Sequence, residues 1–294
     1  MTANAKNGLL AADGKWQNNN LKDPLSILVL NLMPTKRTTE RQFLSTFDFM
    51  DRDVELTFLY PRTHHFKTVS KEDIERCYCC LDDVCNEHFD GMITTGAPVE
   101  TLAFSRVDYI QELKQIFDWA ETHVTERLYE CWAAQAELFL EFGVEKRQLP
   151  NKLFGIYGPD KVDVTSPLLN GLGGNFKMPQ SRNTAAVCSS PIEGVKVVAS
   201  SEQTGPIILR DDDSQETFFT GHPEYTAETL LLEYHRDLNK GIKINKPENY
   251  FVGNDEEQID YSWRTTSLQL YNNWINLIKN TKEVITDDRR KLSV

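Results

Sequence analysis

The segment LYECWAAQAELFLEF, residues 128–142, passes without a break from an apolar strand pattern into an amphipathic helix pattern, and Cys131 stands at the junction. This arrangement is typical of a nucleophile elbow. A thiol at the start of a helix lies among backbone amides that favour the thiolate and that can stabilise the oxyanion formed when a carbonyl is attacked. The segment therefore predicts a cysteine nucleophile. The alternative is a small buried strand residue, because free cysteines are often buried.

Strand patterns and helix patterns alternate along the rest of the chain. The predicted strands are residues 25–33, 54–60, 90–96, 127–131, 195–200 and 217–221, and the predicted helices are residues 108–120, 132–142, 226–239 and 262–279. Asp108 and Thr226 are the expected N-caps of two of these helices. The alternation predicts an α/β fold with a doubly wound, mostly parallel sheet flanked by helices, whose ligands bind at the carboxyl ends of the strands. Gly96, Cys131 and His222 each follow a predicted strand, so we expect them to meet there.

The domain organisation is predicted to be simple. No internal repeat, low-complexity stretch or Pro/Gly-rich linker divides the chain. We expect a polar N-terminal leader over residues 1–20, a single catalytic domain over residues 21–280 and a polar C-terminal tail over residues 281–294.

Composition excludes several classes of function. The chain has 294 residues and a formal net charge of −12. Nucleic-acid backbones are held by clustered Lys and Arg, and because no such cluster is present, we expect no nucleic-acid partner. The apolar runs are far shorter than the roughly 20 residues that a membrane helix needs. The first residues also lack a signal-peptide pattern. We therefore expect a cytoplasmic protein without a membrane partner.

Four of the six cysteines, namely Cys77, Cys79, Cys80 and Cys85, crowd into the segment ERCYCCLDDVC. A structural zinc site usually has two separated pairs of ligands, and no second pair follows this segment at a suitable distance. We therefore expect no metal and read these cysteines as reduced thiols.

A second motif, FFTGHPEY at residues 218–225, follows the last predicted strand of the sheet. Residues two apart on an extended segment project to the same face, so Glu224 can orient or polarise the imidazole of His222, although Pro223 alters the local path. Together with the elbow, this motif favours a triad of Cys131, His222 and Glu224.

These motifs resemble the homoserine O-acyltransferase family of methionine biosynthesis, whose fold is related to class I glutamine amidotransferases. The further segments that carry the resemblance are residues 30–44, 89–104, 107–136, 220–225 and 248–251, with Trp263 and Arg264. The match extends from roughly Pro24 to Leu277 and implies the same α/β fold.

The resemblance implies a ping-pong reaction. In the family the elbow cysteine, here Cys131, becomes an acyl-thioester, and His222 and Glu224 are the base and its partner. The acyl donor would be a coenzyme A thioester used as a co-substrate, with no permanently bound cofactor. A homodimer is compatible with the sequence.

The resemblance also implies the substrate contacts. Family members bind substrate through residues that match Lys152, Ser181 and Arg236, and a lysine matching Lys36 lies beside their site. An arginine suits the carboxylate of an amino-acid acceptor, because its planar fork binds carboxylates through two parallel hydrogen bonds. Without the family, these four residues would pass as ordinary loop or helix residues.

Donor and acceptor are predicted from the pattern around the site. Glu100 occupies the position that is glutamate in members using acetyl-CoA, and a carboxylate there would repel the carboxylate of a succinyl group. We therefore expect acetyl-CoA as the donor. Gln180, Asn183 and Ala185 depart from the family pattern around Ser181. We favour L-homoserine as the acceptor, with L-serine as the alternative, because one methylene changes binding by only about 1–3 kcal/mol.

Three further alternatives stay open at this point. They are a homoserine O-succinyltransferase, a glutamine amidotransferase with the same fold and triad, and a binding protein that has lost activity. The neighbours of Cys131 are not the glycines usual in an amidotransferase elbow, and the intact triad argues against loss of activity.

Overall fold

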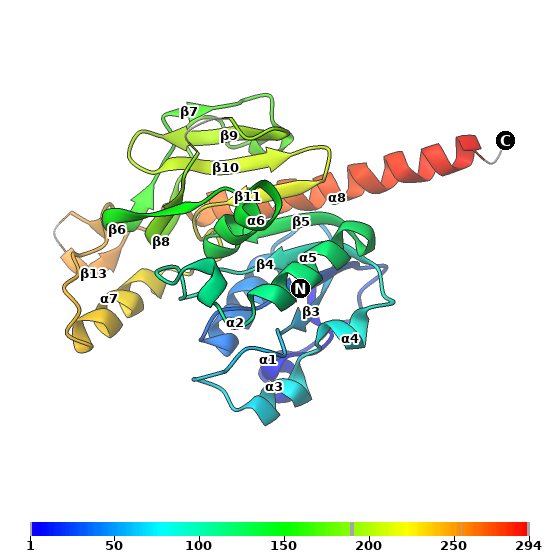
Figure 1. Ribbon diagram of the computed structural model, residues 1–294, viewed down its shortest axis with the longest axis horizontal. Coiled ribbons are helices and arrows are strands. Elements are labelled where there is room, and N and C mark those ends of the chain that lie inside the picture. Colours follow the sequence, from blue (N-terminus) through cyan, green and yellow to red (C-terminus); the bar gives the residue numbers. More distant parts are fainter. Residues whose placement is uncertain (1, 189–190, 254, 293–294) are drawn as a thin grey trace.

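The computed structural model describes residues 2–188, 191–253 and 255–292, and a mixed β-sheet runs through its centre (Figure 1). Its strands, in spatial order, are β1 (Ala3–Ala5), β3 (Val54–Leu59), β2 (Leu25–Leu30), β4 (Phe89–Thr94), β5 (Val124–Glu130), β11 (Glu216–Phe219), β10 (Gly205–Asp211), β9 (Val195–Ser201) and β7 (Lys161–Val162). Neighbours from β1 to β11 are parallel, whereas β10, β9 and β7 continue the sheet with antiparallel pairing. The predicted doubly wound, mostly parallel sheet is confirmed.

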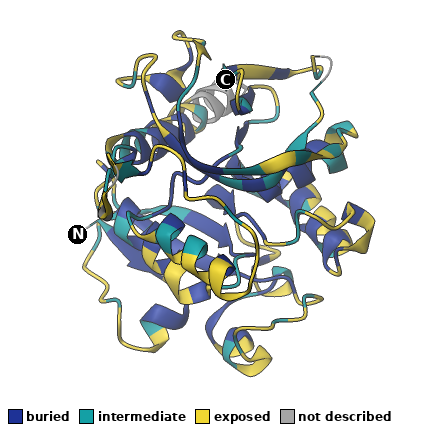
Figure 2. Ribbon diagram, turned by 90° about the vertical axis from the view of Figure 1, so that its left-hand side faces the viewer, coloured by how far each residue is buried: buried dark blue, intermediate teal, exposed yellow. Residues whose placement is uncertain are grey.

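Helices cover both faces of this sheet. The helices are α1 (Leu9–Ala12), α2 (Lys36–Phe47), α3 (Lys71–Cys77), α4 (Leu81–Val84), α5 (Ile110–His123), α6 (Trp132–Phe142), α7 (Thr229–Asn239) and α8 (Arg264–Leu292), with 3₁₀ turns at Phe104–Arg106 and Pro167–Leu169. Strand β2 has a mostly apolar sequence because both of its faces are covered. Ile27 and Val29 pack into the core that α2 and α8 cover, and Leu28 and Leu30 pack into the core that α5 and α6 cover. Figure 2 shows the central strands buried and the outer helix faces exposed.

Two small sheets stand outside the central one. Strands β6 (Lys146–Tyr157) and β8 (Met178–Ala186) pair antiparallel, and so do β12 (Phe251–Val252) and β13 (Asp255–Ile259). A third apolar cluster, which includes Phe154, Leu230 and Trp263, joins β6 to α7 and to the start of α8. This part of the molecule, which the sequence patterns did not predict as strands, supplies side chains to the candidate site.

The predicted segment boundaries need correction at both ends. Residues 1–20, expected as a polar leader, contain β1, which pairs with β3, and α1, whose Leu9 and Leu10 are buried. The backbone amides of Leu9 and Leu10 donate to the Glu40 carboxylate at 2.8 and 2.7 Å, which fixes α1 against α2. The structured domain therefore begins before residue 21. At the other end α8 continues to Leu292, so residues 281–292 of the expected tail belong to this helix, and residues 293–294 lie outside the described residues.

The expected N-caps were also wrong. Tyr109 and Glu228 occupy the N-cap positions of α5 and α7. The Asp108 carboxylate instead accepts a hydrogen bond from the backbone amide of His65 at 3.0 Å. Asp108 is therefore used to hold a neighbouring loop.

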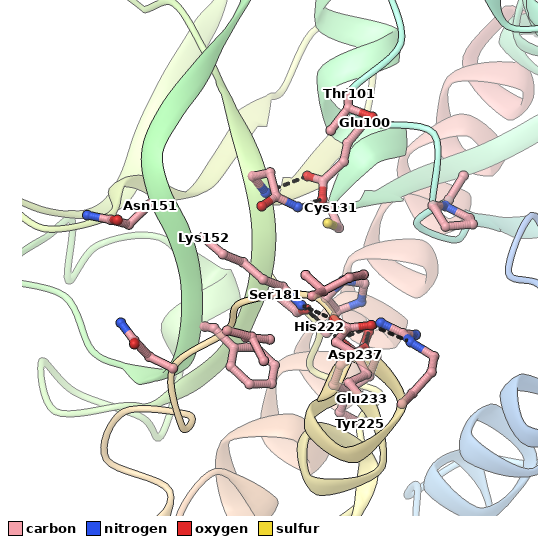
Figure 3. A pocket seen from close by; sticks show the side chains of 18 of the residues that line it. Glu100, Thr101, Cys131, Asn151, Lys152, Ser181, His222, Tyr225, Glu233 and Asp237 are labelled. Atoms are coloured by element: carbon pink, nitrogen blue, oxygen red, sulfur yellow. Dashed lines mark hydrogen bonds and ion pairs between the residues drawn. The ribbon is translucent and has the colours of Figure 1, made fainter. Parts of the chain in front are cut away.

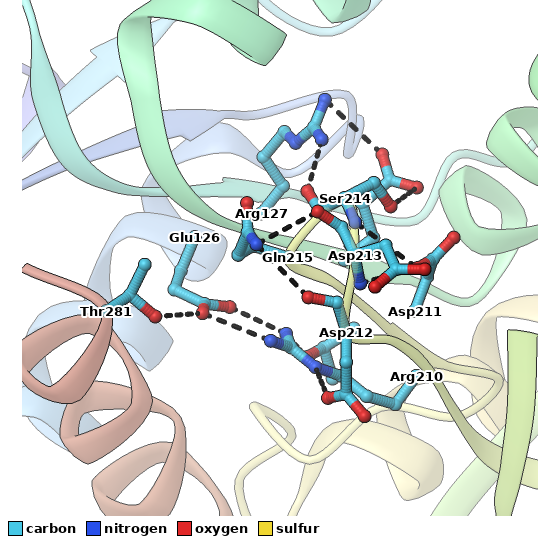
Figure 4. Close-up of polar contacts among 11 residues, drawn as sticks. Glu126, Arg127, Arg210, Asp211, Asp212, Asp213, Ser214, Gln215 and Thr281 are labelled. Atoms are coloured by element: carbon cyan, nitrogen blue, oxygen red, sulfur yellow. Dashed lines mark hydrogen bonds and ion pairs between the residues drawn. The ribbon is translucent and has the colours of Figure 1, made fainter. Parts of the chain in front are cut away.

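A buried polar network ties β5 to β10 and α8 (Figure 4). Arg210 donates to both carboxylate oxygens of Glu126, at 2.6 and 3.1 Å, and the Thr281 hydroxyl donates to the same carboxylate at 2.9 Å. Nearby, the Arg127 side chain donates to the carbonyl of Ser214. A buried carboxylate of this kind is tolerated because a guanidinium satisfies its charge and its lone pairs.

Candidate active site

Cys131 stands at the junction of β5 and α6, as the elbow pattern predicts. Its backbone angles are φ 51° and ψ −110°, a conformation that residues with a side chain rarely adopt. The backbone amide of Cys131 donates to the carbonyl of Phe219 at 2.7 Å, which fastens the turn to the end of β11. The side chain is thereby presented at the carboxyl edge of the sheet, beside the first amides of α6.

His222 and Glu224 lie on the loop that follows β11, and both are buried. Nδ1 of His222 is 2.7 Å from Oε1 of Glu224, and the imidazole stacks on the Tyr225 ring with 4.2 Å between centroids. The backbone amide of His222 donates to the carbonyl of Pro179, which positions the loop against β8. The two-residue spacing therefore does bring the carboxylate onto the imidazole.

Gly96, after β4, completes the close packing around the triad. A β-carbon at this position would lie 2.9 Å from Cε1 of His222 and 3.3 Å from Cβ of Cys131. The imidazole and the cysteine thus approach the same point of the backbone. The sequence prediction that Gly96, Cys131 and His222 meet at one edge of the sheet is confirmed.

The electrostatics of His222 favour the charged imidazole. Burial lowers its pKa, but the neighbouring Cys131 side chain and the Glu224 carboxylate outweigh burial and raise the pKa well above its ordinary value. An imidazolium held between a thiolate and a carboxylate is the arrangement in which a cysteine acts as a nucleophile.

A cavity of about 590 Å³ opens over this group (Figure 3). Cys131 and His222 line it from the sheet edge, and Met33 and Pro34 line it from the loop after β2. Side chains of β6, β8 and α7 form the opposite wall. The volume is within the range of small-molecule sites.

The opposite wall carries paired charges. Lys152 Nζ lies 3.5 Å from the Glu233 carboxylate and 3.3 Å from the Asp237 carboxylate. The Ser181 hydroxyl donates to Glu233 at 2.6 Å, and Arg236 Nε donates to Asp237 at 2.8 Å. The structure therefore brings Lys152, Ser181 and Arg236 together, as the family resemblance implied.

Sequence reasoning missed the acidic half of this wall. Glu233 and Asp237 stand three residues before and one residue after Arg236 on α7. Glu233 and Asp237 are four residues apart, a spacing that places them on one face of a helix, so the run EYHRD contained the signal for a mixed-charge face. The run did not show that this face of α7 is turned toward the cavity that Cys131 lines.

Glu100 lines the cavity near Cys131, and Asn183 holds it there. The backbone amide of Asn183 donates to one carboxylate oxygen of Glu100 at 2.7 Å, and its side-chain amide donates to the other at 2.6 Å. Asn183 is one of the residues that depart from the family pattern, and its contact is with Glu100. Gln180, the other main departure, is buried and accepts from Arg182 Nε at 2.9 Å.

Lys36, expected beside the site, does not line the cavity. It is the first residue of α2, and its side chain folds back so that Nζ donates to the carbonyl of Asn31. Burial lowers its pKa to about 7. The helix start directs this side chain into the protein, where it holds the loop whose Met33 and Pro34 line the cavity, and its role as a support of the site stays a prediction.

Neither a candidate metal cluster nor a membrane-spanning helix is found in the part of the chain that the structure describes. No group of three or more His, Cys, Asp or Glu side chains in it is placed to hold a metal ion, and Cys77, Cys79, Cys80 and Cys85 are free thiols. None of the described helices is long and apolar enough to cross a bilayer.

The fold is an α/β fold of the class I glutamine amidotransferase type. The fold is similar to a glutamine amidotransferase from Thermotoga maritima, with a TM-score of 0.59 and 11% identity over 87% of this chain and 99% of that one. It is also similar to a glutamine amidotransferase from Methylobacillus flagellatus, with a TM-score of 0.53 and 14% identity over 88% of this chain and 94% of that one. At such identities the likeness concerns the fold alone.

Sequence comparison then gives the family. The model of the homoserine O-succinyltransferase family matches residues 4–283. Homoserine O-acetyltransferase of Clostridium tetani is 42% identical over 260 residues, which cover 86% of this chain and 84% of that protein. Homoserine O-acetyltransferase of Lactococcus lactis is 39% identical over 275 residues, which cover 92% and 85%. The chain belongs to the homoserine O-succinyltransferase family and is an acyltransferase.

Proposed function

We propose that this enzyme transfers the acetyl group of acetyl-CoA, through a thioester on Cys131, to the side-chain hydroxyl of L-homoserine, a step of methionine biosynthesis. The observation that carries the proposal is a cysteine elbow beside a buried His–Glu pair, facing a wall of paired charges across one cavity. The first feature suits acyl transfer, and the second suits a free amino acid.

The triad provides for both half-reactions. The Cys131 thiolate attacks the thioester carbonyl, and the oxyanion develops beside the first amides of α6. The tetrahedral intermediate expels the CoA thiolate, which takes the proton of the His222 imidazolium and leaves as the thiol. Neutral His222 then accepts the proton of the acceptor hydroxyl, whose oxygen attacks the acetyl-thioester. Cys131 leaves as a thiolate, and the imidazolium–thiolate pair is restored.

The paired charges fit both ends of an amino acid. Arg236 and Lys152 are cations for the α-carboxylate, and Glu233 and Asp237 are anions for the α-ammonium. In the absence of substrate these groups satisfy one another, so binding exchanges internal ion pairs for substrate ion pairs and leaves no charge unpaired. The acceptor hydroxyl would then point toward the triad.

The acetyl donor is supported by Glu100 and by the relatives. A carboxylate held in place by two amide donors would repel the terminal carboxylate of a succinyl group more than the methyl of an acetyl group. The cited relatives from Clostridium tetani and Lactococcus lactis are named as acetyltransferases, although the family model carries the succinyl name. A second groove, which also includes Glu100, is lined by Lys146 and Arg147 and can receive the anionic arm of coenzyme A.

Two assays test the proposal. Incubation with acetyl-CoA and no acceptor is expected to add the mass of one acetyl group to Cys131, and homoserine is expected to remove it as O-acetylhomoserine. L-Serine in place of homoserine tests the alternative acceptor, and ammonia release from glutamine tests an amidotransferase. An unmodified Cys131 in enzyme that turns over would falsify the thioester route. A cytoplasmic location and a homodimer stay predictions.

A further inference from the structure

Two buried glutamates lie on the same strand and have opposite surroundings. Glu126 and Glu130 of β5 are both fully buried. Glu126 faces the guanidinium of Arg210, which satisfies its charge (Figure 4). Among the described residues no Lys or Arg forms an ion pair with Glu130, the residue immediately before Cys131. Its charge would therefore have no dedicated counterion.

The surroundings of the Glu130 carboxyl group are one tyrosine and the charged groups of the triad. Oε1 accepts a hydrogen bond from the Tyr271 hydroxyl of α8 at 2.5 Å. The titratable groups that face it besides Tyr271 are Glu224, His222 and Cys131. Within the described part of the chain, Oε2 of Glu130 and Oε2 of Glu224 each lack a hydrogen-bond partner. Two carboxyl groups of the same buried region thus each have a free oxygen.

Two carboxylates buried together do not both ionise, because repulsion and desolvation raise the pKa of one of them. Glu224 lies 2.7 Å from the imidazole that is held as a cation, so it keeps the negative charge. Glu130 has only the neutral hydroxyl of Tyr271. Burial and then the Glu224 carboxylate raise the pKa of Glu130 well above its ordinary value, against the opposing effects of Tyr271 and His222.

We propose that Glu130 is a positioning residue for acyl transfer: it stands as a neutral carboxylic acid behind the triad, anchored by Tyr271, and its O–H donates a hydrogen bond to the free oxygen of Glu224. A single negative charge then remains in this region, on Glu224. The hydrogen bond from Glu130 orients the Glu224 carboxylate toward His222. Glu130 is not among the residues that line the cavity. The inference rests on the proposed function for its kinetic consequence, but the protonation state does not depend on that function.

The protonation state is tested directly by infrared spectroscopy. The difference spectrum of wild type minus E130Q at neutral pH is expected to show the C=O stretch of a protonated carboxyl group. E126Q is the matched control, because it removes a buried glutamate from the same strand that is paired with Arg210, and its difference spectrum is expected to show carboxylate bands. Carboxylate bands in the E130Q difference spectrum would overturn the proposal.

Stability against pH gives a second test that needs no substrate. A carboxyl whose folded pKa is raised above its unfolded value of 4.5 binds more protons in the folded state, so it costs stability as the pH rises above 4.5. The melting temperature of E130Q relative to wild type is therefore expected to increase with pH above that point. A difference that moves the opposite way would show a stabilising carboxylate and would also overturn the proposal.

Kinetics test the positioning role. Glutamine copies the shape of a neutral acid and keeps a donor for Glu224, so E130Q is expected to keep most of the rate that E130A loses, with kcat for E130A reduced roughly tenfold or more and KM changed little. The alkylation of Cys131 by iodoacetamide requires neither donor nor acceptor. Its pH profile is expected to be the same in E130Q and in the wild type. A shifted profile, or equal rates for E130A and wild type, would remove the assigned role. If the infrared and alkylation results are as expected but no acyl transfer is found, the proposed function is wrong. The protonation of Glu130 is not contradicted by that result.

Discussion

The backbone of Gly96 lies directly against the imidazole of His222, so that a β-carbon at position 96 would stand 2.9 Å from Cε1 of the ring. We expect Gly96→Ala to displace the imidazole from Cys131 and to lower kcat/KM by about 10²-fold, because a shift of about 1 Å in a catalytic group has an effect of this size. Steady-state kinetics with circular dichroism on the same sample measure this. Gly174→Ala is the control, because the nearest atom to its added β-carbon is 3.6 Å away. Wild-type activity in Gly96→Ala would contradict the packing argument.

Replacing Glu233 tests the acceptor wall. Glu233→Gln keeps the shape but removes the charge that faces Lys152 and the substrate ammonium, so the KM for the amino-acid acceptor is expected to rise roughly tenfold to a hundredfold. Acetylation of Cys131 by acetyl-CoA alone should be unchanged, since this step does not involve the acceptor. Glu228→Gln, an exposed position at the start of α7, serves as the control. An equal loss in both half-reactions would show that Glu233 acts on the fold and not on the acceptor.

Donor selectivity should depend on Glu100. Glu100→Gly removes the fixed carboxylate, so the ratio of kcat/KM for succinyl-CoA to that for acetyl-CoA is expected to rise by about tenfold or more. Asn183→Ala should change the same ratio in the same direction by less, because Glu100 keeps its charge and the backbone donor but loses the side-chain donor. Glu145→Gln, which lies in the neighbouring groove, is the control for removal of a nearby negative charge. Unchanged selectivity in Glu100→Gly would show that donor choice is made elsewhere.

The transfer step should depend on the charge of His222. In the free enzyme the Cys131 side chain and the Glu224 carboxylate raise the pKa of His222 well above its ordinary value, so the ring stays charged as the pH rises. Acetylation leaves a neutral thioester at Cys131, so the contribution of Cys131 to this pKa is lost and the pKa of His222 falls. The acceptor step requires the neutral ring and accelerates as the pH rises through that lower pKa. We expect transfer from enzyme acetylated beforehand to homoserine to slow as the pH falls, measured by rapid quench and mass spectrometry. A transfer rate that is the same in acid as at neutral pH would contradict this.

Local sequence order was enough to find the elbow and the His–Glu motif. A strand followed at once by a helix leaves its own pattern in the residues around Cys131, and the carboxyl ends of parallel strands lie at one edge of the sheet wherever those strands fall in the chain. Other elements were missed because they leave no such local pattern. Strand β1 and helix α1 are too brief for a periodicity to show, and the first half of β6 is largely exposed, so it has no apolar run.

The chain by itself determined the class of fold, the cysteine, and the histidine with its glutamate, because each of these is encoded in residues that are neighbours along the backbone. Only the tertiary structure decided what surrounds them. It turned one face of α7 toward the cavity, placed Asn183 on Glu100, directed Lys36 away from the site, and put Glu130 and Tyr271 behind the triad. Those relationships join residues far apart in sequence, and they arise from the packing of whole elements, which no local pattern records.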